Sequence, residues 1–500
     1  MKPRLKWLKA SLAGLTASAG FILSAGAVRA AAMEPITPVD PSPMVGITLD
    51  LKNPGPAIAP DFSGLSFEVS TLLPNDQGIR YFRPDNLPLI NLFHTLGIKN
   101  LRIGGNTSDR DARKLPEEAD LDSLFEFAKT ADVKVIYCLR LHNGDPQADA
   151  ATAKYILSHY AAQLDCFSIG QEPSAYPVEK TDTRPQGERM GATNEKYQYS
   201  DYAADWKKFA DIIIAENPNV KFAGPSVHNN GVWAQKFMTD FGQTNHVGLV
   251  TEHLYAGGAG GKVPTPEIGR DRMLSNDFKA KYAKLYDSFV PMAISNGLPY
   301  RLEEVNNYFN GGATNVSNTF ASALWGLDFM YWWAAHGATG LNFHTGDRVA
   351  AGYALQPSKY TAFFSTTNGY NIRPLGYAIK AFSLGGHGHL IPATISNPGH
   401  LNLSAYAVLG DDQRIYLTII NKEHGTNARA ANISLGGLTA AQTISLSAPN
   451  NDVAATNGET LGDATIQSDG SWNGHWQPVD AASTLTIPAA SAAIFVLSPK

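Results

Sequence analysis

Short apolar segments alternate with longer segments of helical patterning from about residue 62 to residue 345, and this rhythm constrains the fold more than any other feature. Eight segments have the length and apolar character of buried strands: Phe62–Ser70, Asn100–Gly105, Lys134–Leu141, Leu164–Glu172, Lys221–Ser226, Leu249–Tyr255, Tyr300–Asn306 and Gly340–Thr345. Helical patterning falls at Asn86–Leu96, Leu121–Ala131, Ala150–Gln163, Tyr199–Asn217, Ser275–Ser295 and Thr319–His336. Eight strands alternating with helices predict an α/β fold, the (β/α)8 TIM barrel. An open doubly wound sheet is the alternative, but no strand-to-helix turn carries a phosphate-binding glycine pattern.

The pattern changes near residue 385, where short alternating strands separated by Gly, Asn, Asp and Pro replace the helices. These strands predict a C-terminal antiparallel β-sandwich domain. The early strand Val45–Leu51 has no place in the barrel, so we expect it to join the sandwich. The predicted division is a signal peptide over 1–32, a linker and N-terminal strand over 33–60, the catalytic barrel over 61–384 and the β-sandwich over 385–500.

The N-terminus has the pattern of an export signal. Four basic residues within the first nine positions precede the apolar stretch Leu12–Ala27, and small residues follow at Ala30–Ala32. We therefore expect cleavage there and a periplasmic or secreted protein that does not stay in the membrane. A formal net charge of −5 gives no electrostatic reason to expect binding to nucleic acid.

The sequence predicts no cofactor and no metal, because no Cys/His cluster has metal-ligand spacing. The two cysteines, Cys138 and Cys166, both fall inside predicted strands. Two buried thiols and one disulfide are both compatible with that placement.

Two predicted strands carry carboxylates at or near their carboxyl ends. The fourth strand ends at Glu172, just before Pro173, and the seventh contains Glu303 and Glu304. The fourth and seventh strands of a closed eight-stranded barrel lie on opposing sides of its mouth, so these carboxylates face each other at the end where barrel enzymes carry their chemistry. Paired carboxylates are what glycoside hydrolysis requires, one as the acid for the leaving oxygen and one to attack or to activate water.

Strand parity limits the choice on the seventh strand. Adjacent side chains point to opposite faces, so only one of Glu303 and Glu304 is expected to aim at the barrel axis. Parity alone does not say which of the two it is.

Three stretches carry a resemblance to a known family: Leu101-Arg102-Ile103-Gly104-Gly105-Asn106, Ile169-Gly170-Gln171-Glu172-Pro173, and Leu302-Glu303-Glu304 followed by Gly311-Gly312-Ala313. As an ordered set they resemble glycoside hydrolase family 79, the β-glucuronidases and heparanases, within the large clan of retaining glycosidases on (β/α)8 barrels. The β-sandwich tail built partly from an N-terminal strand is also that family's layout.

The resemblance implies a role for each matching position. It makes Glu304 the nucleophile, Glu172 the acid/base, and Arg102 the cation that keeps the nucleophile ionised. It implies a turn at Gly311 and Gly312 whose backbone N–H groups hold a uronate carboxylate. The remaining positions implied to bind the sugar are Glu68, Asn106, Gln171, His253, Tyr255 and, more weakly, Tyr308 and Tyr353.

Gln171 departs from the family pattern, which has Asn immediately before the acid/base to bind the sugar 2-hydroxyl. Gln keeps the donor and the acceptor but is one methylene longer. Structural roles are open for several other positions: Glu304 as an ion-pair partner of Arg102 or Arg301, His253 as a hydrogen-bonded core histidine, and Gly311-Gly312 as an ordinary turn.

The combined reading predicts a retaining exo-β-glucuronidase that acts on carbohydrates carrying a terminal β-linked uronic acid. A β-xylosidase or β-glucosidase on the same scaffold is the alternative among enzymes. A non-catalytic carbohydrate-binding protein is the alternative outside them.

Overall fold

The computed structural model describes residues 42–109, 114–176, 197–345, 347, 357–480 and 484–499, and all structural statements concern these residues. From Ser42 onward the chain forms one compact unit. The predicted signal peptide, most of the predicted linker, and Tyr353 lie outside the described residues.

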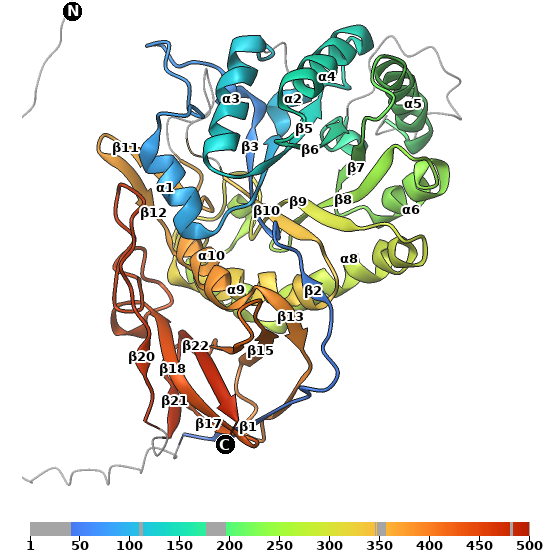
Figure 1. The fold of residues 1–500 in the computed structure, drawn as a ribbon. Helices are drawn as coiled ribbons and strands as arrows, with labels where there is room; N and C mark the ends of the chain where they lie inside the picture. The colour runs from blue at the N-terminus through green and yellow to red at the C-terminus, as the bar shows by residue number, and fades with distance from the viewer. Residues whose placement is uncertain are drawn as a thin grey trace, which may run out of the picture. The chain divides into compact units, whose positions relative to one another are not determined.

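Eight parallel strands close into a barrel in the order β10-β3-β4-β5-β6-β7-β8-β9, which confirms the predicted barrel (Figure 1). The strands are β3 (Ser63–Glu68), β4 (Asn100–Gly104), β5 (Lys134–Leu139), β6 (Leu164–Ile169), β7 (Phe222–His228), β8 (Val247–Tyr255), β9 (Tyr300–Asn306) and β10 (Gly340–His344). Nearly all of their residues are buried. This is expected for barrel strands, because helices cover the outer face of the sheet and the inner face points into the packed interior.

Helices surround the barrel: α1 (Leu87–Leu96), α3 (Glu118–Thr130), α4 (Pro146–Tyr160), α5 (Tyr199–Glu216), α6 (Gly231–Phe241), α8 (Asn276–Ser295) and α9 (Phe320–Ala335). Shorter or later helices are α2 (Asn106–Asp109), α7 (Pro266–Leu274) and α10 (Pro374–Gly385). The six predicted helices are present within a few residues. Helices α2, α6, α7 and α10 were not predicted. Helix α6 begins directly after Asn229-Asn230, which has the composition of a turn, and α7 is short and mostly polar.

Strand β6 is shorter than predicted, and the prediction that it runs to Glu172 is wrong. The strand ends at Ile169 because Gly170 has φ +91° and Glu172 has φ +45°, and neither value fits an extended strand. The Glu172 N–H donates to the carbonyl of Ser226 at the end of β7 (2.9 Å). Glu172 therefore sits on a tight turn above the strand rather than on the strand itself.

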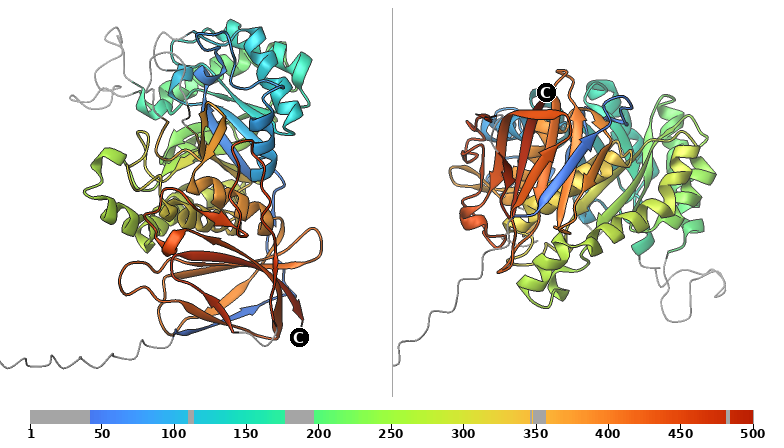
Figure 2. Two further views of the ribbon diagram at one scale, coloured as in Figure 1. Left: turned by 90° about the vertical axis from the view of Figure 1, so that its left-hand side faces the viewer. Right: turned by 90° about the horizontal axis from the view of Figure 1, so that it is seen from below.

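Two sheets, built mainly from residues that follow the barrel, pack face to face (Figure 2). The larger runs β19 (Thr460–Leu461), β18 (Leu438–Ser447), β22 (Ser491–Pro499), β16 (Ile415–Asn421), β15 (Leu403–Leu409), β13 (Gly388–Ile391) and β2 (Ala57–Ile58), with β20 (Gln477–Pro478) against β18. The smaller runs β14 (Ala393–Ser396), β1 (Met44–Leu49), β17 (Ala431–Leu435) and β21 (Leu485–Ile487). A separate hairpin joins β11 (Phe363–Thr366) and β12 (Gly369–Ile372).

The N-terminal strand β1 lies inside the smaller sheet, as predicted, and the right-hand view of Figure 2 shows it in blue among the C-terminal strands. Its pairing with β14 is antiparallel, but its pairing with β17 is parallel, so the sandwich is not purely antiparallel. Val45 and Ile47 are buried between the two sheets in one apolar cluster with Leu417 and Phe495. The exact domain boundaries at residues 60 and 385 stay predictions.

Helix α9 joins the barrel to the sandwich. It contacts β10 on one side and β16 on the other, and nearly all of its residues are buried, including Trp325 and Trp333. A helix that is apolar all round is expected where it is covered on every side. None of the helices in the described part of the chain is both long enough and apolar enough to cross a membrane.

A buried ion cluster fixes this junction. Asp328 on α9 accepts a hydrogen bond from Lys422, just after β16 (2.7 Å), and another from the Tyr406 hydroxyl on β15 (2.7 Å). Lys279 on α8 lies 3.2 Å from the same carboxylate. The side chains of Asp328 and Lys422 are 7% and 3% exposed, so each charge depends on the other for compensation.

Replacing Asp328 with Asn should destabilise the protein by roughly 3–5 kcal/mol, because it leaves the buried Lys422 ammonium without its main counter-charge. The matched control is Asp211→Asn, which breaks the Lys207–Asp211 pair (2.6 Å) on the exposed face of α5. This change should cost less than about 1 kcal/mol. Urea unfolding of both variants measures the difference. Equal losses would contradict the importance of the buried cluster.

Candidate active site

The side chains singled out by the sequence gather at the carboxyl ends of the barrel strands. Arg102 comes from β4, Gln171 and Glu172 from the turn after β6, His253 from β8 and Glu304 from β9. These ends meet at one mouth because all eight strands are parallel.

A β-bulge on β9 places both adjacent glutamates in the barrel. Leu302 pairs with Glu252 of β8 and Glu304 with His253, so Glu303 is an extra residue with no partner opposite it. The pairing with β10 shifts at the same point. A bulge of this kind interrupts the alternation of side chains.

The expectation that only one of the two glutamates faces the barrel axis is therefore wrong. Leu302 and Val305, on either side of the pair, both pack into the large apolar core. Glu303 and Glu304 both lie within ion-pair distance of His253. Glu303 is fully buried, and the Glu304 side chain is 7% exposed.

Three hydrogen bonds hold the carboxylate of Glu304. Its Oε2 accepts from Arg102 Nη1 (2.9 Å) and from Gln171 Nε2 (3.0 Å), and its Oε1 accepts from the Tyr255 hydroxyl (2.8 Å). Burial raises the pKa of Glu304, but the charges of His344, His253 and Arg102 and the Tyr255 hydrogen bond outweigh it and hold the pKa far below its usual range. Glu304 is therefore an ionised, fixed carboxylate.

The glycines after Arg102 make room for this arrangement. A Cβ at Gly104 would lie 2.1 Å from the Arg102 guanidinium carbon, and a Cβ at Gly105 would lie 2.5 Å from the carboxylate of Glu68. Gly105 also has φ +73°, which side chains rarely adopt. The Gly-Gly pair is thus required by the buried charges on both sides of it.

Gln171 bridges the cation and the nucleophile candidate. Its amide oxygen accepts from Arg102 Nη2, and its amide nitrogen donates to Glu304. The backbone N–H of Gln171 donates to Asp109 Oδ2 (2.5 Å), and Tyr176 donates to the same carboxylate. The longer side chain therefore reaches Glu304 itself, and its predicted contact with a sugar hydroxyl stays a prediction.

Glu172 lies beside His253. Its Oε1 is 3.1 Å from His253 Nδ1, and its side chain is 15% exposed, more than that of any other charged group in direct contact with Glu304 or His253. One oxygen of Glu172, one of Glu304 and one ring nitrogen of His253 all lie within 4.8 Å of one another. The two carboxylates predicted from the strand order thus share one site.

His253 is fully buried, and desolvation alone would lower its pKa. The charge of Glu304 and the contacts with Glu172 and Glu303 outweigh desolvation and raise the pKa to about 9. His253 is therefore an imidazolium at neutral pH, with both ring nitrogens carrying hydrogen.

The three groups Glu172, Glu304 and His253 are close enough together to contact one cation. A protonated imidazole has no lone pair for a metal, and His253 already compensates the two carboxylates. We therefore expect an ion-paired cluster here rather than a metal centre.

Glu68 and His344 form a second charged pair at the mouth. Glu68 Oε2 accepts from both the backbone N–H and the hydroxyl of Thr107 (2.7 Å each), and its Oε1 lies 3.7 Å from His344 Nε2. Burial opposes ionisation of both groups, but Glu304 and Glu68 raise the pKa of His344, and His344 lowers that of Glu68. Glu68 thus lies beside His344, whose Nδ1 is 4.0 Å from Glu304 Oε2, and its predicted contact with sugar hydroxyls stays a prediction.

Of the other predicted substrate contacts, Tyr308 turns away from these carboxylates. Tyr308 is buried against Phe278, and its hydroxyl donates to the Gly269 carbonyl (2.8 Å), so it does not join the cluster. Asn106 is exposed at the start of α2. Gly311 and Gly312 form a left-handed turn (φ +78° and +83°) after β9.

Sequence reasoning missed three aromatic or imidazole side chains at the mouth. His344 ends β10, His228 ends β7 with its ring 5.7 Å from that of Tyr255, and Tyr360 lies 6.1 Å from Tyr255. The signal for the first two was their position at a strand's carboxyl end. Tyr360 lies in an irregular segment with no such signal.

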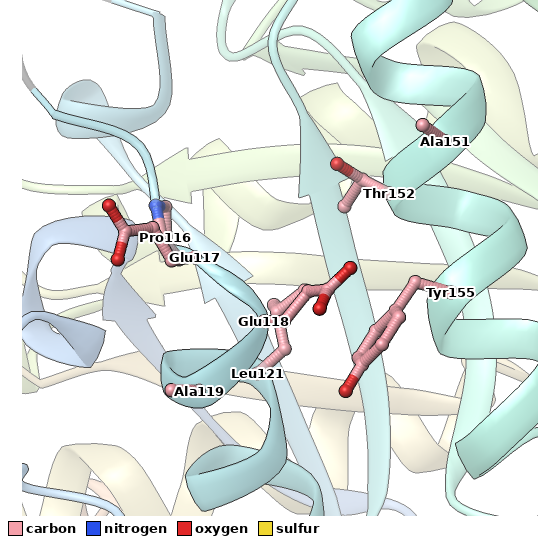
Figure 3. A pocket seen from close by; sticks show the side chains of 8 residues that line it. All are labelled: Pro116, Glu117, Glu118, Ala119, Leu121, Ala151, Thr152 and Tyr155. Atoms are coloured by element: carbon pink, nitrogen blue, oxygen red, sulfur yellow. The ribbon is translucent and has the colours of Figure 1, made fainter.

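Cys138 and Cys166 are both buried and free, so the disulfide alternative is wrong. A hollow of about 500 Å³ lies away from the carboxylates, on the outer surface between α3 and α4 (Figure 3). It is lined by Pro116, Glu117, Glu118, Ala119, Leu121, Ala151, Thr152 and Tyr155. Its acidic groups are exposed, and the Tyr155 hydroxyl is bonded to Asp122 (2.7 Å), so it offers no catalytic group.

His253 should lose its proton near pH 9 rather than near the usual value of about 6.5. Because the folded pKa is raised, the stability it contributes is present in full below about pH 6.5 and is lost as the pH rises through about 9. NMR of ¹³C-histidine-labelled protein measures the titration, with His253→Gln identifying the signal. A midpoint at or below 6.5 would contradict the ion-paired cluster.

Comparison with protein-family models matches residues 120–330 to the N-terminal domain of glycosyl hydrolase family 79. A β-glucuronidase from Aspergillus niger is 28% identical over 201 residues. That alignment spans 37% of this chain and only 35% of the relative, about a third of its length.

Solved glycosidase structures share the fold over nearly the whole chain. A 4-O-α-L-rhamnosyl-β-D-glucuronidase from Fusarium oxysporum aligns with a TM-score of 0.68 at 17% identity, over 90% of this chain and all of the other. An α-L-arabinofuranosidase from Thermotoga maritima gives 0.61 at 14% identity (91% and 100%), and a β-xylosidase from Caulobacter crescentus gives 0.57 at 13% (91% and 99%). Residues 120–330 of this chain are therefore similar to the N-terminal domain of glycosyl hydrolase family 79, and the solved structures share the fold of the chain.

Proposed function

We propose that this chain is a glycoside hydrolase, and specifically a retaining exo-β-glucuronidase. The observation that carries the proposal is the pair Glu172 and Glu304, brought together at the barrel mouth with Glu304 held ionised by Arg102 and Tyr255. Glycosidases need this division between a charged carboxylate and a second carboxyl group that exchanges a proton.

The reaction proceeds in two steps. In the first, a Glu304 oxygen bonds to the anomeric carbon while the bond to the leaving oxygen breaks, and that oxygen takes the proton of Glu172. In the second, Glu172 takes a proton from water, the water oxygen bonds to the anomeric carbon, and the bond to Glu304 breaks. Both carboxyl groups are then back in their starting states.

The spacing of the carboxylates supports retention over inversion. Retaining enzymes hold the two carboxyl groups roughly 5–5.5 Å apart, whereas inverting enzymes leave roughly 6.5–9.5 Å for a water molecule. One oxygen of Glu172 lies within 4.8 Å of one oxygen of Glu304, and this close approach is in keeping with the shorter spacing.

Two observations support a preference for a uronic acid. The Aspergillus niger relative is named a β-glucuronidase, and the Gly311-Gly312 turn follows β9, the strand that carries Glu304. Left-handed glycine turns expose backbone N–H groups that suit an anion such as a uronate carboxylate. We also propose, from the basic and then apolar N-terminus, that the protein is exported.

A panel of aryl β-glycosides that differ only at C5 tests the proposal. The glucuronide should be hydrolysed about 100-fold more efficiently in kcat/KM than the glucoside or the xyloside, because losing hydrogen bonds to the carboxylate costs roughly 3 kcal/mol. The sugar released first should have the β configuration when followed by NMR. Glu304→Gln should be folded and lose at least about 1,000-fold in kcat.

Each other outcome points elsewhere. Hydrolysis of the xyloside or glucoside but not the glucuronide would identify a neutral β-glycosidase. An α-configured first product would overturn retention. Full activity of Glu304→Gln would refute the assignment of the nucleophile, and absence of any hydrolysis or burst would indicate a carbohydrate-binding protein.

A further inference from the structure

Glu303 is a buried carboxylate that the reaction described above does not use. It is 0% exposed, and the bulge on β9 turns it into the barrel next to Glu304. Burying a carboxylate is costly unless a charge compensates it, so its presence inside the barrel calls for a partner.

That partner is His253, which faces Glu303 with its Nε2 atom. Glu303 Oε1 lies 3.5 Å from His253 Nε2, which is within ion-pair range although long for a hydrogen bond. Among the described residues, no hydrogen bond of normal geometry is made by either Glu303 oxygen or by His253 Nε2. The two groups therefore face each other across this distance.

The near side of the same ring contacts Glu172. His253 Nδ1 lies 3.1 Å from Glu172 Oε1, so a single imidazole spans the distance from Glu303 to Glu172. A ring that donates to a carboxylate on each side needs hydrogen on both nitrogens.

We propose that Glu303 is a positioning residue for the acid/base: its carboxylate holds His253 as an imidazolium, and His253 in turn fixes Glu172 by a hydrogen bond from Nδ1 to Oε1. The inference rests on the proposed function. It gives the second glutamate of the Glu303-Glu304 pair a role of its own.

The other charges around His253 explain why Glu303 is needed. Arg102 on β4 disfavours the imidazolium, and burial does so more strongly. Glu304 on β9 favours it more than any other group, but Glu304 also pairs with Arg102 (2.9 Å). His228 on β7 is an imidazole whose pKa burial lowers, so it adds no negative charge.

Glu303 itself is suited to stay ionised. Burial raises its pKa, but His253, Arg102 and Ser226 outweigh this and lower it. Tyr202 and Cys166 also face it, and both have pKa values raised by burial, so both are neutral. His253 and Arg102 are therefore the cations that Glu303 compensates.

The arrangement acts on the proton that Glu172 delivers. With Oε1 bonded to His253, that proton is carried by Oε2. The imidazolium then stabilises the Glu172 carboxylate that remains after the proton leaves, by a charge-assisted hydrogen bond. Acid catalysis matters most for poor leaving groups, so the effect of Glu303 should depend on the leaving group.

The test is Glu303→Gln, compared with Glu252→Gln as the matched control. Glu252 is the neighbour of His253 on β8, is also 0% exposed, and has a pKa raised to about 8 by burial, so it is mainly uncharged at pH 7. Both variants replace a buried carboxyl group with an amide of the same size. Only the first removes the charge facing His253.

Two measurements are made on each variant. In Glu303→Gln the NMR titration midpoint of His253 should fall by at least about 1 pH unit, the usual effect of removing a nearby opposite charge. The kcat/KM for a phenyl glucuronide should fall at least about 10-fold while that for a dinitrophenyl glucuronide falls less than about 3-fold. At pH 7, where Glu252 is mainly uncharged, Glu252→Gln should leave the ratio of the two rates unchanged, and it should lower the His253 midpoint by less than Glu303→Gln does.

An unchanged His253 midpoint, or equal losses on both substrates, would overturn the inference. If Glu303→Gln does not fold, Glu303→Asp keeps the charge at a greater distance and should show the same selective loss on the phenyl substrate in smaller degree; an equal loss on both would overturn it as well. A wild-type protein that hydrolyses no glycoside would refute the proposed function, and the NMR comparison would still decide whether Glu303 holds the charge on His253.

Discussion

The ion pair between Arg102 and Glu304 is the interaction on which the rest of the site depends. The Arg102 side chain is 0% exposed, and a buried guanidinium is tolerated only with good compensation. Gly104 and Gly105 leave space for the guanidinium and for Glu68, and Gln171 accepts its second N–H group. The turn after β6 is also fixed, because Asp109 accepts a hydrogen bond from the Gln171 N–H group. The charge on Arg102 thus accounts for sequence features on three different strands.

The β-bulge on β9 solves a second problem, which is how one strand can supply two neighbouring carboxylates to the barrel interior. A regular strand would send one of them outward into the apolar core, where Leu302 and Val305 pack. The bulge brings Glu303 into the barrel beneath Glu304 at the cost of one unpaired position in each ladder. The resulting cluster alternates acidic groups with Arg102, His253 and His344, so that each carboxylate has a cation beside it.

Much of this could be predicted from sequence, and what could not has a physical reason. The alternation of strands and helices predicted the closed barrel, and strand order alone brought Glu172 and Glu304 together. Parity failed at Glu303 because a bulge leaves no signature in residue types. Strand β6 was predicted to be too long, because the residue types of Gln171 and Glu172 do not indicate the left-handed turn that begins at Gly170. Tyr308 was expected at the site from the family resemblance, but its side chain is buried and its hydroxyl donates to the Gly269 carbonyl. His344 was passed over because a lone histidine at a strand end is a weak signal without its partner Glu68.

The central claim is that Glu304, held ionised by Arg102, is the group that bonds to the sugar. A 2-deoxy-2-fluoro-β-glucuronyl fluoride slows the second step more than the first and should trap the covalent intermediate on the intact protein. Peptide mapping by mass spectrometry should then locate one fluoroglucuronyl group on Glu304. A label on Glu303 or Glu172, or turnover of the reagent with no covalent product at any time, would contradict the account.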